Sequence, residues 1–75
     1  MNITDALWQD PSRMSGAVCF RATRIPVSIL FDYLERGELD EFYRGYPDVS
    51  GEQVLAVLET SRELVSERFA IEPSH

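Results

Sequence analysis

The fold is decided by residues 26–69, which read PVSILFDYLERGELDEFYRGYPDVSGEQVLAVLETSRELVSERF. Apolar residues recur through this stretch at helical spacing, and a glycine and a proline interrupt the spacing. The stretch therefore predicts three helices over about residues 27–36, 39–46 and 51–69. About four residues around Pro47-Asp48-Val49 join the last two, which is the outline of a helix-turn-helix.

Each predicted helix has a recognisable start or end. Pro26 suits the opening turn of the first helix, and Gly37 suits its C-terminal cap. The second helix ends at Pro47, because the residue before a proline avoids helical geometry. The third begins with a capping box, in which Ser50 accepts from the Gln53 amide and the Gln53 side chain reaches back. The apolar positions are Val27, Leu30, Phe31 and Leu34, then Leu39, Phe42, Tyr43 and Tyr46, then Val54, Val57, Leu58, Leu64 and Val65.

Two short apolar segments precede the helices. Residues 6–9 end at the turn signal Asp10-Pro11, and residues 17–21 are β-branched and aromatic and lie between small residues. We expect them to pair within a β element over about residues 6–24, which must pack on helices because a lone hairpin is marginal in water. The predicted fold is mostly α, with a short N-terminal β-hairpin or strand pair followed by three helices. It forms a single domain over residues 1–75, with a tail at 70–75.

The length of 75 residues limits the size of the core. Such a core rarely supplies more than about 3–5 kcal/mol. A single cysteine, Cys19, excludes an internal disulfide, and the one histidine, His75, leaves no plausible zinc cluster. Association with another chain is the remaining support, so we expect a homodimer. We find no nucleophile constellation, phosphate loop or metal motif, and therefore expect a non-enzymatic protein with no cofactor and no metal.

The sequence also predicts where the protein resides. The richest apolar window, residues 25–31, is seven residues long and contains a proline, so we expect no membrane span. Asp5 stands near the start, where a signal peptide would carry basic residues. We therefore expect a cytoplasmic protein.

The net charge of −6 is unevenly distributed. Residues 1–28 carry three arginines and two acids, a charge of +1, whereas residues 29–75 carry four arginines and eleven acids, a charge of −7. Because phosphate backbones demand positive charge, only the N-terminal third suits nucleic acid. The acidic helical part suits a basic protein.

Residues 15–27, Ser-Gly-Ala-Val-Cys-Phe-Arg-Ala-Thr-Arg-Ile-Pro-Val, resemble the signature of the family catalogued as domain of unknown function 433. That signature reads roughly Gly-Gly-Lys-Pro-(Val/Cys)-Ile-Arg-Gly-Thr-Arg-Ile-Pro-Val, and Asp10-Pro11 looks like the Asp-Pro that precedes it. Tyr46-Pro47 is similar to the start of a second signature, which continues in Val49, Ser50, Gln53, Val54, Ala56 and Leu58. The resemblance covers about residues 5–60.

The resemblance implies a homeodomain-like or winged-helix-like domain without enzymatic activity. Several members resemble antitoxins paired with PIN-type ribonuclease toxins, so it implies a protein-binding, antitoxin-like module with such a partner. A dimeric helix-turn-helix DNA-binding transcription regulator is the alternative. Two departures matter: Ala22 stands where the family usually has glycine, and Ala17-Val18 replace Lys-Pro. The lost basic residue weakens a DNA-binding role for the isolated chain, and Ala22 is strained if its position needs a positive φ.

Six polar residues are candidates for contacts with a partner protein or nucleic acid: Arg13, Arg21, Thr23, Arg24, Glu52 and Gln53. The arginines could bind phosphate or carboxylates. The structural alternative is that Arg24 pairs with an acid on the helices and that Thr23 caps the first helix. Glu52 and Gln53 lie in the first turn of the third helix and could read bases, but no basic residue follows before Arg62.

Six other residues are candidates for a dimer or partner surface: Trp8, Val18, Phe20, Leu64, Val65 and Phe69. The first three belong to the hairpin, whose strand edges invite pairing between chains. The others lie in the second half of the third helix, which is longer than the two short helices can cover. Among the aromatic residues, Trp8 and Tyr33 are the two that we expect outside the core.

Overall fold

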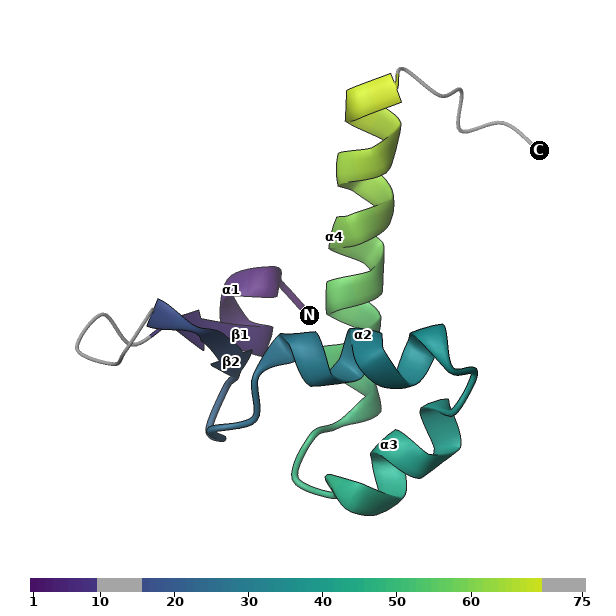
Figure 1. Ribbon diagram of the computed structural model, residues 1–75. Helices are drawn as coiled ribbons and strands as arrows, with labels where there is room; N and C mark the ends of the chain where they lie inside the picture. The colour runs from purple at the N-terminus through teal and green to yellow at the C-terminus, as the bar shows by residue number, and fades with distance from the viewer. Residues whose placement is uncertain (10–15, 70–75) are drawn as a thin grey trace.

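The computed structural model describes residues 1–9 and 16–69. In these residues the chain forms four helices and two strands (Figure 1). Their order along the chain is α1 (Ile3–Ala6), β1 (Leu7–Gln9), β2 (Val18–Phe20), α2 (Val27–Glu35), α3 (Leu39–Gly45) and α4 (Gly51–Phe69). The mostly helical fold with an N-terminal hairpin is confirmed, and the ends of the three predicted helices are correct to within one residue. Residues 10–15 and 70–75, including Arg13 and the predicted tail, lie outside the described residues.

The two strands form the predicted antiparallel hairpin. Leu7 pairs with Phe20, Trp8 with Cys19, and Gln9 with Val18. Helix α1, which the sequence analysis did not predict, is a single turn that begins where the Asn2 side chain accepts a hydrogen bond from the amide of Thr4. One turn is too short for a periodic signal to mark. Helix α1 packs against α4 and so attaches the hairpin to the helices (Figure 1).

Helix α2 ends as Gly37 predicts. Gly37 has a φ of 69°. Its amide donates to the carbonyl oxygen of Leu34, and the amide of Glu38 donates to the carbonyl oxygen of Tyr33. These two bonds form a Schellman motif, which satisfies carbonyl groups at the helix end.

Arg36 lies over the Tyr33 ring. Its Nε donates to Glu38 Oε1 at 2.8 Å, and this hydrogen bond raises the pKa of Arg36 above its ordinary value.

The core lies where α2, α3 and the first half of α4 meet the second strand. Its buried side chains are Phe20, Leu30, Phe42, Val49, Val54 and Val57. Tyr33, which we expected outside the core, is half-buried and packs its ring edge-on against Phe42 and Tyr46. Phe31, which we expected inside, is 38% exposed. The prediction is therefore wrong for this pair, because α2 turns its Tyr33 side rather than its Phe31 side toward the aromatic residues of α3.

Helix α4 is divided into a buried half and a free half. Its capping box forms as predicted: Ser50 Oγ accepts from the Gln53 amide at 3.1 Å, and Gln53 Oε1 accepts from the Ser50 amide at 2.9 Å. Four residues of its first two turns are buried, namely Gln53, Val54, Ala56 and Val57. Each residue of 60–69 is exposed or half-buried, and this outer half of α4 extends beyond the rest of the fold (Figure 1). None of the helices in the described part of the chain has the length and apolar character needed to cross a membrane.

Candidate functional site

The turn that joins β2 to α2 is built by Thr23. Its Oγ1 donates to the carbonyl oxygen of Phe20 at 2.8 Å and accepts from the amide of Ile25 at 3.0 Å. The amide of Phe20 in turn donates to the carbonyl oxygen of Ile25 at 3.0 Å. Thr23 does not cap α2, since the N-cap residue is Pro26 and no side chain bonds there. Its hydroxyl is thus committed to the turn, not offered to a ligand.

Ala22 lies in this turn with a φ of 68°. The left-handed region costs a residue with a Cβ about 1–2 kcal/mol, and glycine occupies it freely. The position therefore does take a positive φ, so this chain carries strain at Ala22.

Ala22→Gly is expected to stabilise the protein by about 0.5–1 kcal/mol. Relief of the left-handed strain exceeds the added freedom of glycine in the unfolded chain. Urea denaturation followed by circular dichroism measures the change. Ala17→Gly is the matched control, because Ala17 is exposed and has no positive φ, and it should not stabilise. A less stable Ala22→Gly protein would contradict this explanation.

The two arginines of the turn are exposed, but one of them has a structural bond. Arg21 Nη2 donates to the carbonyl oxygen of Thr4 at 2.6 Å and thereby ties β2 to α1. Arg24 is exposed. The structure thus brings Arg21 and Arg24 onto one turn. In the described part of the chain the Arg21 guanidinium bonds to the backbone, whereas the Arg24 side chain is exposed to solvent. Arg13 is outside the described residues.

The hairpin does not present the apolar surface that we expected. Phe20 is completely buried in the core, so its assignment to a dimer or partner surface is wrong. Val18 and Trp8 are half-buried. Trp8 also has an internal partner, because its Nε1 donates to the carbonyl oxygen of Thr23 at 2.9 Å. These contacts hold the hairpin to its own turn and leave little of it for another chain.

Gln53 is placed differently from its neighbour Glu52. Gln53 is 8% exposed, and its Nε2 donates to the carbonyl oxygens of Ala6 at 3.3 Å and Arg21 at 3.2 Å. With Oε1 bound to the Ser50 amide, the whole amide group is occupied. The assignment of Gln53 to a base or partner contact is therefore wrong, because its side chain joins α4 to α1 and the end of β2. Glu52 is exposed in the first turn of α4.

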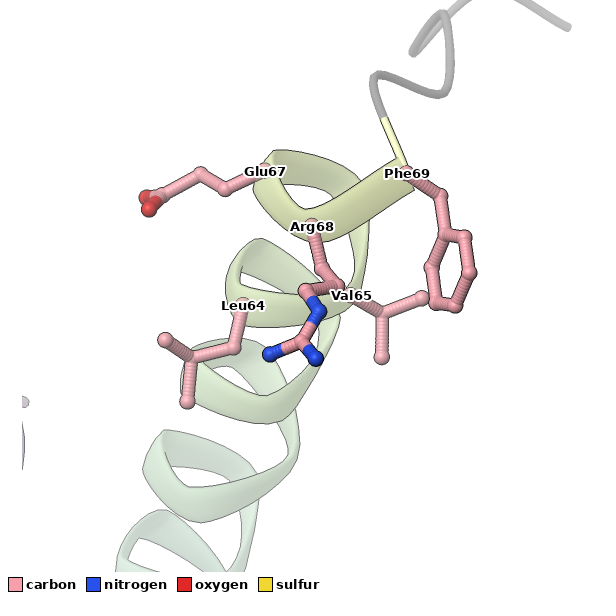
Figure 2. Close-up of a pocket in the computed structure, with 5 residues that line it drawn as sticks. All are labelled: Leu64, Val65, Glu67, Arg68 and Phe69. Atoms are coloured by element: carbon pink, nitrogen blue, oxygen red, sulfur yellow. The ribbon is translucent and has the colours of Figure 1, made fainter.

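The outer half of α4 carries three large exposed apolar side chains. Leu64, Val65 and Phe69 are 61%, 50% and 70% exposed, as expected for a surface that binds another chain. Figure 2 shows Leu64 and Glu67 on one side of the helix and Val65 and Phe69 on the other, with Arg68 between them. These five residues line a shallow depression. The helix therefore offers two different apolar sides.

Acidic side chains follow one side of the same half-helix. Glu59, Glu63 and Glu67 are each four residues apart, so they lie in one row along the helix. A second shallow depression is lined by Glu59, Arg62, Glu63, Ser66 and Glu67. The acidic charge of the helical part was expected but this row was not, although its spacing of four residues was a usable signal. We call Glu63, Leu64 and Glu67 the acidic face of α4.

A chemical site is not evident in the part of the chain that the structure describes. Within residues 1–9 and 16–69 no three histidine, cysteine or acidic residues gather in a way that could hold a metal ion. Cys19 is buried, and its sulfur lies 3.9 Å from the carbonyl oxygen of Ala17. The most distinctive surface of the described residues is the outer half of α4.

The comparison with known families agrees with the signatures in the sequence. A family described as "Protein of unknown function (DUF433)" matches residues 8–59. The chain belongs to the DUF433 family. The DUF433 match covers the hairpin, α2, α3 and the buried half of α4, and it ends where the outer half of α4 begins. No curated protein and no solved structure matches the sequence significantly.

Proposed function

We propose that this DUF433 protein is a non-enzymatic regulatory module that binds a protein, as the antitoxin-like component of a pair with a PIN-type ribonuclease. The observation that supports the proposal best is the acidic face of α4. There Leu64 is 61% exposed next to Glu63 and Glu67, on a half-helix that no other part of the described chain covers. Amphipathic helices of this kind bind in apolar grooves of partner proteins.

The charges of the acidic face favour a basic partner. Residues 29–75 carry a charge of −7, and a ribonuclease must present positive charge where it binds the phosphates of RNA. Complementary charge accelerates association and selects the partner, while an apolar anchor such as Leu64 supplies affinity. An acidic helix bound across such a cleft would also exclude the RNA.

The alternative, a DNA-binding helix-turn-helix protein, has less support from the geometry. The N-terminal turn of α4 would be the recognition element. Gln53 is buried there and Glu52 is negative, and the first cation of α4 is Arg62. DNA binding by the isolated chain is therefore the alternative outcome of the experiment below.

Co-expression with the product of the adjacent gene tests the proposal. We expect a stable complex in which the ribonuclease activity of the partner is inhibited. Glu63→Lys with Glu67→Lys should weaken the complex at least tenfold, since both changes place positive charge against a basic rim. Asp32→Lys with Glu35→Lys is the matched control: it makes the same charge change on exposed positions of α2 and should have little effect.

Three outcomes would overturn parts of this proposal. A neighbouring product that is neither a nuclease nor bound would reject the antitoxin-like role. A complex equally weakened by the α2 control would reject the acidic face as the binding site. Binding of the isolated chain to its own promoter DNA, with an affinity that falls steeply as salt rises, would favour the DNA-binding alternative.

A further inference from the structure

A second stripe runs along α4 on the side away from the acidic face. Its positions recur at alternate intervals of four and three residues, which is the spacing of helices that pair along a seam. They are Gly51, Leu55, Leu58, Arg62, Val65 and Phe69, which we call the α4 seam. Five of them are exposed and Leu58 is half-buried, so the seam is accessible along the whole helix.

The seam lies apart from the acidic face, and of its six residues Leu58 also packs against the buried core cluster while the other five are exposed. At 3.6 residues per turn the six positions fall within about 80° of one another around the helix. The buried residues Val54 and Val57 lie on a neighbouring side, toward α1 and the core. In Figure 2, Val65 and Phe69 of the seam point away from Leu64 and Glu67 of the acidic face.

We propose that the α4 seam binds the α4 seam of a second copy of this chain, with the two helices antiparallel. An alignment that places Leu55 opposite Val65 also places Phe69 opposite Gly51 and Leu58 opposite Arg62. Phe69, the largest side chain of the seam, then meets the residue that has none. An added Cβ at Gly51 would have only the Tyr43 hydroxyl within 4 Å, at 3.9 Å, so the space above Gly51 is open to a ring.

Charge favours this orientation over a parallel one. A parallel pair would place Arg62 directly against Arg62 of the second copy, and like charges at such a position oppose pairing. In the antiparallel pair each Arg62 lies opposite Leu58 of the second copy, and Glu59 is the next residue after Leu58. The arrangement allows two Arg62–Glu59 ion pairs related by symmetry. The seam is thus complementary to itself, and that identifies a second copy as its occupant rather than an unrelated protein.

The size of the core makes such pairing useful. Within the described residues the buried cluster of the core comprises six side chains, which is little for a domain without a disulfide. Pairing over 19 residues of α4 would cover Leu55, Val65 and Phe69, three of the large exposed hydrophobic residues. The acidic faces stay uncovered on the outside, so the dimer and the partner complex do not compete.

The oligomeric state of the full chain tests the inference. Sedimentation equilibrium at micromolar concentration should show a dimer. Val65→Asp with Phe69→Asp should weaken dimerisation at least 100-fold, whereas Leu64→Asp should leave it unchanged, although Leu64 is more exposed than Val65 and adjacent to it. Circular dichroism and thermal unfolding check that each variant is folded. Because each chain carries −6, added salt should strengthen the dimer by screening repulsion.

Disulfide cross-linking tests the orientation. A mixture of Leu55→Cys and Val65→Cys proteins should form a mixed disulfide, while Val65→Cys alone should not cross-link to itself. A Val65→Cys homodimer would overturn the antiparallel arrangement. A monomer at micromolar concentration, or a dimer dissociated by Leu64→Asp but not by the Val65 and Phe69 changes, would overturn the seam itself. Neither result depends on whether the ribonuclease partner is found.

Discussion

Replacing Gln53 with alanine is expected to remove most of the protein's free energy of unfolding at 25 °C. The substitution removes three long-range or capping contacts: Oε1 from the Ser50 amide at 2.9 Å, and Nε2 to the carbonyl oxygens of Ala6 and Arg21. The Ala6 carbonyl keeps the Arg21 amide as a donor at 2.8 Å, so the Ser50 amide and the Arg21 carbonyl are the groups that lose their partner. Each buried polar group left without a partner costs about 1–3 kcal/mol. A total loss of about 3 kcal/mol is comparable with the whole stability of a domain this small, about 3–5 kcal/mol.

The loss of stability depends on the side-chain amide that glutamine places at position 53. Gln53 Oε1 must accept from α4's own N-terminus while its Nε2 donates to two carbonyl oxygens from α1 and the end of β2. A carboxylate can do only the first of these. Gln53→Glu would set a negative oxygen against the Ala6 and Arg21 carbonyls and should be at least as harmful as alanine. The amide donor, not the capping oxygen alone, is therefore expected to carry the stability.

Urea denaturation at one fixed chain concentration measures this loss, since association would shift the apparent stability. Glu52→Ala is the matched control: it is the adjacent residue in the same turn but is exposed, and it should change stability by no more than about 0.5 kcal/mol. If Gln53→Ala unfolds at the same urea concentration as Glu52→Ala, then the Gln53 bridge does not hold the hairpin to α4.

The helix boundaries could be predicted because they depend on local chemistry. Gly37 takes a positive φ that few residues tolerate, and the Ser50–Gln53 box uses atoms three residues apart. The burial of Tyr33 in place of Phe31 could not be predicted in this way. Both lie near the apolar side of α2, and the choice between them depends on where α3 places Phe42 and Tyr46.

The candidate site was only partly predictable for a similar reason. The free half of α4 follows from its length, since α2 and α3 are too short to cover 19 residues. The burial of Gln53 does not follow, because its two carbonyl partners are 47 and 32 residues distant in sequence. A polar residue three positions after a capping serine has no feature in the sequence that distinguishes a bridge from a surface contact.

Phe42→Ala should destabilise the protein as strongly as the change at Gln53, through packing rather than hydrogen bonding. Phe42 is completely buried, and its ring centroid lies 5.3–6.1 Å from four others. These rings belong to Phe20, Tyr33, Tyr43 and Tyr46. Truncating a buried phenylalanine costs about 3–5 kcal/mol, because the neighbours close only part of the cavity.

Phe42 also connects the hairpin, α2 and α3 through ring contacts. Its ring joins the hairpin through Phe20 to α2 through Tyr33, and the latter already supports the end of α2 beneath Arg36. Losing the ring should therefore loosen the hairpin and α3 together, so that circular dichroism and tyrosine fluorescence report one coincident transition. Phe42→Leu keeps most of the volume and should cost about 1–2 kcal/mol.

The control for Phe42 is Phe31→Ala, the same substitution on a ring that is 38% exposed on α2. It should cost clearly less than Phe42→Ala, because water already contacts much of that ring and little cavity is left. Thermal and urea unfolding of the two variants provide the comparison. Equal losses at Phe31 and Phe42 would mean that the aromatic cluster of α2 and α3 does not centre on Phe42, and that the core extends to the side of α2 that the structure leaves open.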